Sequence, residues 1–409
     1  MNRTSENLQI KEYEPDPELT ALLASYDTRA KEDAVTPIGE LKGGDLAPEN
    51  EIDCLPQAMV QDTALLDFIN EVQMYYTGAQ VSATALTSMT SQMRAGTIRK
   101  CDMASIYTYQ NTLYKLQMTG EQLRRFMEWS AAFFKTWKPD EVTIAFDPSV
   151  RYYLYDAFEG VNYELDVSKE PGHRIKNLKW PNGKAVKDTD TFVVAVNNYR
   201  ATTQLLTAAD IFLPGEELPK LLEIDVRGDV GGIRELLGEY IRTVKGGTIE
   251  PHVNNNWKIV GNNWKAADHQ KAVQLLREGK LALNENADAR TLPGKAITTR
   301  ISPSSKKQFP VKRGFPCWDG KPLFCVRNRR ISTVSRELVE KTVPFRSISW
   351  YNETVLVSLL WADGSKRPDR ARKGSQKKPC RKRPLQPLQQ HRAQAALPSC
   401  GSPVRRAIP

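Results

Sequence analysis

The character of this 409-residue sequence changes abruptly near Leu292, and the change limits how much of the chain we expect to fold. Before it, apolar residues recur at the spacings of helices and strands. After it, the chain is rich in Arg, Lys, Pro, Ser and Gln, and residues 301–409 carry 24 Lys and Arg against 6 Asp and Glu. Segments of this composition do not bury enough apolar surface to fold. We therefore predict that residues 286–409 form a basic, Pro- and Arg-rich, disordered tail.

The basic charge of the whole chain belongs to this tail and not to a folded surface. The net charge is +10 overall, yet residues 1–300 contribute −8 and residues 301–409 contribute +18. The tail has no zinc-ligand spacing and no helical basic face, so we do not expect it to form a nucleic-acid interface. A shifted or extended reading frame would explain the abrupt change of composition equally well.

Two further classes of protein are disfavoured by simple patterns. We find no apolar run of the length that a signal peptide or a membrane-spanning helix needs, so we expect neither membrane contact nor an export signal in this chain. The six cysteines are scattered without the close pairs of a zinc knuckle or a redox dithiol, and we interpret them as structural or incidental thiols. They are Cys54, Cys101, Cys317, Cys325, Cys380 and Cys400.

The middle of the chain alternates between helical and strand periodicity. Apolar residues at helical spacing follow Asp62 and stop at Gly78, which predicts an amphipathic helix. Thr119 and Gln122 have the spacing of a capping box and predict the start of a second helix. Between residues 152 and 196 the period shifts towards two, which indicates strands. We therefore predict an α+β domain over residues 58–285, with a mixed sheet flanked by helices, behind a polar linker at residues 1–57.

A series of motifs in this region is similar to those of one bacterial enzyme family. In chain order the segments are Gln61–Glu71, Ala79–Ser82, Ser105–Leu113 with Met118–Leu123, Tyr155–Asp166, Gly172–Ile175, Val194–Arg200, and Glu239–Ile241 through Lys258. Over about residues 15–285 they resemble the C-terminal nucleotide-binding domain of the 5'-nucleotidase and 2',3'-cyclic-nucleotide 2'-phosphodiesterase (3'-nucleotidase) family. That family acts in nucleotide catabolism outside the cytoplasm.

The resemblance implies three substrate-binding residues. Tyr109 and Tyr199 fall at the family's two nucleobase-stacking positions, and Asn111 falls where the family uses an amide against the base edge. Two aromatic side chains can stack on a base for about 1–3 kcal/mol per stacked base, and an amide offers both a donor and an acceptor. The alternative is that both tyrosines pack into a core at the ends of strands. The expected partner is a nucleotide or a nucleoside.

Two departures from the family pattern bear on its subtype. The nucleotidases proper carry an arginine at the position of Thr90, so the sequence favours the cyclic-phosphodiesterase and 3'-nucleotidase branch. After Tyr199 the family continues with a glycine-rich run, whereas this chain has Ala201-Thr-Thr-Gln-Leu-Leu206. Because bulk replaces glycine there, we expect a reshaped loop.

The resemblance implies that the family's catalytic chemistry takes place in a different domain. Its N-terminal domain holds two divalent metal ions with Asp, His and Asn ligands, which activate water for phosphoester hydrolysis. The four histidines of this chain, His173, His252, His269 and His391, stand in none of those motifs. We therefore predict no catalytic residue, metal ligand or cofactor in this chain. It is either the recognition half of a hydrolase whose metallophosphoesterase domain is missing or separate, or a catalytically silent nucleoside-binding or structural remnant.

Overall fold

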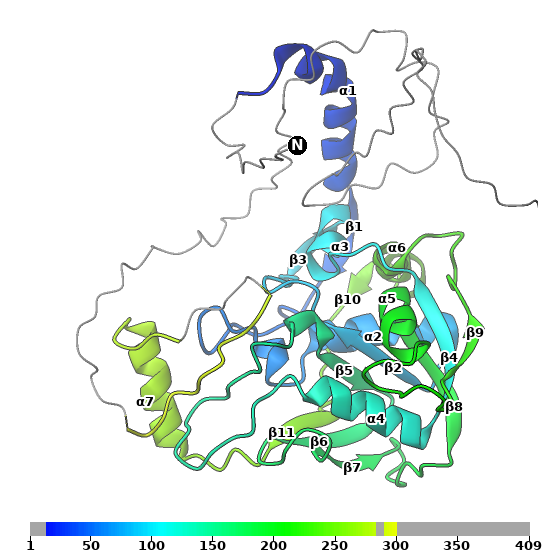
Figure 1. Cartoon of the computed structure of the whole chain (residues 1–409). Helices are drawn as coiled ribbons and strands as arrows, with labels where there is room; N and C mark the ends of the chain where they lie inside the picture. The colour runs from blue at the N-terminus through cyan, green and yellow to red at the C-terminus, as the bar shows by residue number, and fades with distance from the viewer. Residues whose placement is uncertain (1–13, 284–289, 301–409) are drawn as a thin grey trace, which may run out of the picture. The chain divides into compact units, whose positions relative to one another are not determined.

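The computed structural model describes residues 14–283 and 290–300, and its centre is a five-stranded mixed sheet (Figure 1). The strand order is β5-β2-β8-β4-β9. The strands are β2 Val81–Ala85, β4 Leu113–Thr119, β5 Asp156–Glu159, β8 Thr191–Asn197 and β9 Lys220–Glu223. Only β2 and β8 run parallel, and the other three pairings are antiparallel. The predicted α+β class with a mixed sheet is therefore confirmed.

Two three-stranded sheets accompany the central one. The first has the order β10-β1-β3 and the second β11-β6-β7. Their strands are β1 Pro37–Leu41, β3 Gly96–Arg99, β6 Asn162–Asp166, β7 Ile175–Lys179, β10 Thr248–Ile249 and β11 Trp257–Val260. Each sheet joins segments that are distant in the sequence, so the two ends of the folded region are held together by backbone hydrogen bonds.

The two helices that the sequence predicts most directly are present. α2 spans Ala64–Thr77 and ends at Gly78, whose φ of 64° lies in the left-handed region. α4 spans Gly120–Ala131 and begins with the predicted capping box, in which Gln122 N–H donates to Thr119 Oγ1 at 3.2 Å and Thr119 N–H donates to Gln122 Oε1 at 3.0 Å. The remaining helices are α1 Pro17–Ala34, α3 Lys100–Ile106, α5 Asn198–Arg200, α6 Ile233–Glu239 and α7 Ala266–Arg277. None of the described helices is long and apolar enough to cross a bilayer.

α2 and α4 cover opposite faces of the central sheet. The ring of Phe158 on β5 lies 4.9 Å, centroid to centroid, from that of Phe126 on α4. The carboxylate of Glu159, the next residue of β5, lies instead beside Asp67 of α2. Because successive strand residues point to opposite faces, the sheet is enclosed between these helices (Figure 1).

Packing extends beyond both boundaries that the sequence suggests. Within the predicted linker of residues 1–57, Leu41 on β1 and Leu46 are buried in the core, whereas α1 has no buried residue. At the other end Leu292 is buried, and Val142 N–H donates to the Ile297 carbonyl at 2.8 Å. Residues 290–300, which the sequence assigns to the disordered tail, are therefore packed because they pair with the segment before β5. The rest of the predicted tail, apart from residues 290–300, lies outside the described residues.

One glycine makes the turn from β5 to β6 possible. Gly160 has φ +84°, and a Cβ there would lie 1.9 Å from the Gln80 carbonyl oxygen. Gly183 has nearly the same φ, +83°, but nothing lies within 4 Å of its Cβ position. The two positions share a backbone conformation and differ in the space around it.

We expect Gly160→Ala to destabilise the chain far more than Gly183→Ala. Backbone strain applies to both and costs about 1–3 kcal/mol. Only the first substitution adds a clash with the Gln80 carbonyl just before β2, for a total above about 3 kcal/mol. Urea denaturation of the two variants beside the wild type measures the difference. Equal losses would show that the close approach of β2 is not a constraint.

Candidate functional site

The two tyrosines predicted to bind a base lie next to strand ends at the same edge of the central sheet. Leu113, the first residue of β4, pairs with Asn197, the last residue of β8. Tyr109 lies in the loop before β4, and Tyr199 lies in α5 directly after β8. We call this end of the sheet the Asn197 edge. Tyr109 is 38% exposed and Tyr199 is 43% exposed, so neither ring fills the core.

The loop that carries Tyr109 is held from beneath. Tyr107 is fully buried, and this burial raises the pKa of its phenol to about 12. The side-chain amide of Asn111, the third predicted residue, donates to that hydroxyl at 3.3 Å. Arg234 on α6 donates to the carbonyl oxygens of Tyr107, at 3.1 Å, and of Thr108. The conformation of the loop between α3 and β4 is thus tied to buried groups.

A third tyrosine, which the sequence analysis did not assign to the site, lies at the same edge. Tyr153 belongs to a short 3₁₀ turn, Tyr152–Leu154, just before β5. Its ring centroid is 6.5 Å from that of Tyr109, with the planes at 72°. The first residue of β5, Asp156, pairs with Ala85 at the end of β2, and β2 runs parallel to β8. The only sequence signal for this neighbour is its place just before a strand that begins at the Asn197 edge.

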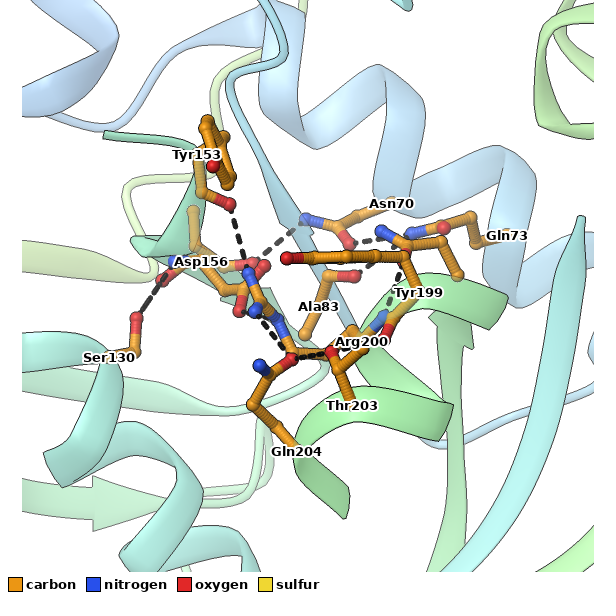
Figure 2. A network of polar contacts seen from close by, with 12 residues as sticks. Asn70, Gln73, Ala83, Ser130, Tyr153, Asp156, Tyr199, Arg200, Thr203 and Gln204 are labelled. Atoms are coloured by element: carbon orange, nitrogen blue, oxygen red, sulfur yellow. Dashed lines mark hydrogen bonds and ion pairs between the residues drawn. The ribbon is translucent and has the colours of Figure 1, made fainter. Parts of the chain in front are cut away.

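A buried ion pair between Arg200 and Asp156 lies between the segments that carry Tyr153 and Tyr199 (Figure 2). Arg200 Nε is 2.7 Å from Asp156 Oδ2, and the two side chains are 2% and 1% exposed. The guanidinium also donates to the Tyr153 carbonyl at 3.0 Å and to Gln204 Oε1 at 3.1 Å. It lies over the ring of Trp129 on α4, 4.9 Å from the centroid. Burial raises the pKa of Asp156, while the charge of Arg200 acts in the opposite direction.

The segment in which bulk replaces glycine is a helical turn. Residues Ala201–Leu205 continue α5 as one turn of π-helix, and Ala201 and Leu205 are fully buried. Thr203 Oγ1 donates to the Tyr199 carbonyl at 2.6 Å. The reshaped loop that the sequence predicts is therefore a turn whose apolar side chains anchor it in the core.

The family model of the 5'-nucleotidase C-terminal domain matches residues 37–206, a range that contains Tyr109, Asn111, Tyr199 and the turn after it. Residues 37–206 are therefore similar to the C-terminal domain of the 5'-nucleotidase family. The match begins at the first residue of β1, which agrees with the packing of that strand and not with a linker running to residue 57.

The relatives of this domain belong to longer proteins. A 2',3'-cyclic-nucleotide 2'-phosphodiesterase/3'-nucleotidase of Haemophilus influenzae is 29% identical over 285 residues, which cover 60% of this chain and 40% of that protein. The protein of the same name from Yersinia enterocolitica is 28% identical, with 50% and 36% covered. A solved 5'-nucleotidase precursor from Thermus thermophilus is 16% identical with a TM-score of 0.45, covering 60% of this chain and 43% of that one. The chain thus spans at most about two fifths of the length of these curated relatives.

The matched range also contains a buried carboxylate cluster that the sequence analysis missed. Asp62, Asp67 and Glu159 are all buried, and one carboxylate oxygen from each lies within 4.8 Å of the others. Asn254 N–H donates to Asp67 at 3.1 Å, and the Asn254 amide donates to Glu159 at 2.7 Å. Asn256 N–H donates to Asp62 at 3.2 Å. Glu159 lies far from Asp62 and Asp67 in the sequence, so no short spacing pattern could reveal the cluster.

Such a cluster must lose charge by binding protons or a cation, because three buried carboxylates repel one another. Burial raises the pKa of Asp67 to about 9 and that of Glu159 to about 7, and it also raises the pKa of Asp62. Oxygen ligands of this kind could hold a hard divalent cation. The raised pKa values favour bound protons at neutral pH.

These pKa shifts predict that the chain loses stability as pH rises. Between the ordinary pKa of Asp67, 3.8, and its raised value of about 9, the folded chain binds a proton that the unfolded chain has released. Stability from this group is complete at acidic pH and is lost towards pH 9. The side chain in Asp67→Asn stays neutral throughout. From about pH 5 to about pH 8 this variant should therefore lose less stability than the wild type, by about 1–3 kcal/mol.

Urea denaturation with EDTA present throughout measures this difference, with the exposed Asp53→Asn as the matched control. The control should follow the wild type. A wild-type chain that gains stability towards alkaline pH would show that the carboxylates are ionised together. A wild-type chain that is stable at alkaline pH only with a divalent metal would show the same.

Proposed function

We propose that this chain binds the nucleoside part of a nucleotide and acts as the recognition half of a metal-dependent phosphoester hydrolase in nucleotide catabolism. The observation that carries the proposal is the placement of Tyr109 and Tyr199, two half-exposed rings that reach the Asn197 edge from separate segments. A flat heterocycle is bound well by aromatic faces presented on a rigid support.

The surrounding groups suit a nucleoside better than a purely apolar ligand. Asn111 lies in the same loop as Tyr109, and its amide is oriented by the buried Tyr107 hydroxyl. An amide held in this way can read the donor and acceptor pattern of a base edge. The names of the Haemophilus and Yersinia relatives favour 2',3'-cyclic nucleotides and 3'-nucleotides as the substrate class.

We assign the hydrolytic chemistry to a metallophosphoesterase domain outside the described residues. The family's metal pair uses histidine and asparagine as well as carboxylate ligands, and it activates water between two ions. The cluster of Asp62, Asp67 and Glu159 does not fit that role, because it contains carboxylates only and raised pKa values keep protons on it. It also lies at the end of β5 opposite to Asp156.

Calorimetric titration of the full chain with adenosine and 3'-AMP tests the recognition role. Tyr109→Ala and Tyr199→Ala should each weaken binding by roughly 5- to 150-fold, equivalent to about 1–3 kcal/mol for one stacked base. Tyr26→Ala is the matched control, because Tyr26 is half-exposed on α1. It should leave the affinity unchanged.

Two outcomes would contradict this assignment. A folded wild-type chain that binds neither ligand would favour the alternative, a catalytically silent structural remnant in which the helical turn after Tyr199 closes the site. Release of phosphate from 2',3'-cyclic AMP by the purified chain with added Mn²⁺ would show that the chemistry is not confined to another domain.

A further inference from the structure

Arg200 is a buried charge whose contacts exceed what charge neutralisation requires. It is 2% exposed, and one carboxylate, Asp156, already balances its charge. A buried ion pair is often no more stabilising than apolar residues of the same volume. Stability alone therefore gives little reason for an arginine at this position, directly after a residue proposed to stack on a base.

The directions of its contacts suggest a different role. Nε forms the ion pair with Asp156 at the start of β5, Nη2 donates to the carbonyl of Tyr153, and Nη1 donates to Gln204 in the helical turn. Its own backbone N–H is bound by Asn197 Oδ1 at 2.8 Å. One planar group thus joins the turn of Tyr199 to the turn of Tyr153 (Figure 2).

Asp156 is itself fixed, so the junction is rigid. Although Asp156 lies at the end of a strand, its backbone is held in place because its N–H donates to Ser130 Oγ on α4 at 2.8 Å. The guanidinium is also covered by the ring of Trp129. Buried, hydrogen-bonded and covered on one face, Arg200 has little room to change rotamer.

We propose that Arg200 is a positioning residue of the nucleoside site, which holds Tyr199 in a fixed relation to Tyr153, and that Tyr153 is a third aromatic contact of the ligand. This inference rests on the proposed nucleoside-binding function. The edge-on packing of Tyr153 against Tyr109 supports it, since it brings Tyr153 to the ring already assigned to the base. A lysine could pair with Asp156, but its ammonium could not also reproduce the two hydrogen bonds that the planar guanidinium donates to Tyr153 and Gln204.

The first measurement is the adenosine affinity of Arg200→Lys and Tyr153→Ala in the full chain. We expect each to weaken binding by roughly 5- to 30-fold, the effect of losing about 1–2 kcal/mol of positioning or stacking. Arg174→Lys is the matched control, because Arg174 is also fully buried and donates to the backbone carbonyls of Ala131 and Phe134. It should lower the melting temperature without changing the affinity.

A double-mutant cycle separates positioning from general destabilisation. If Arg200 acts by fixing Tyr199 relative to Tyr153, Arg200→Lys should weaken adenosine binding less than about twofold in a Tyr199→Ala background, where that relation no longer matters. An equal loss in both backgrounds would overturn the proposal. An unchanged affinity in Tyr153→Ala would also overturn it. Tyr153 is half-buried, and its replacement keeps the backbone carbonyl that Arg200 binds, so this variant tests the proposal even if Arg200→Lys does not fold.

The result for the wild type distinguishes the two levels of inference. A wild-type chain that does not bind adenosine removes the proposed function and this inference together. Binding that is lost in Tyr199→Ala but retained in both Arg200→Lys and Tyr153→Ala removes only the role of Arg200 and Tyr153.

Discussion

The antiparallel pairing of β4 with β8 is the constraint on which the candidate site depends. Its register sets Leu113 opposite Asn197, so the loop before one strand and the helix after the other meet at one edge. A slip of one residue would turn every side chain of β4 to the other face of the sheet. β2 extends the same arrangement because it runs parallel to β8 and pairs its last residue with Asp156. Three segments that are distant in sequence are therefore brought to one edge by backbone hydrogen bonds between strands.

Local signals explain what could be predicted from the sequence. The helix ending at Gly78 and the capping box at Thr119 are short-range patterns, and both are present in the structure. β1 and residues 290–300 were assigned to irregular segments because their partners are remote: β1 pairs with β10, and Val142 pairs with Ile297. The periodicity of a short stretch of sequence does not indicate such a long-range pairing.

The same distinction applies to the candidate site. Tyr109, Asn111 and Tyr199 were named from the order of family motifs, and their roles in binding stay predictions. The position of Tyr153 beside Tyr109 depends on the meeting of two strand ends. The contacts of Arg200 depend on the burial of β5 between two helices. Neither could be inferred from residue type or spacing, because both arise from tertiary packing.

The turn of π-helix after Tyr199 has a consequence for the thermodynamics of any ligand at this edge. Ala201 and Leu205 are buried in the core, so the backbone that carries Tyr199 is ordered before a ligand arrives. A glycine-rich loop would have to give up conformational freedom on binding, whereas this turn has already lost it during folding. Conformational entropy is thus lost on folding and not on binding. The site therefore offers a fixed aromatic surface and adapts less to ligands of different shape.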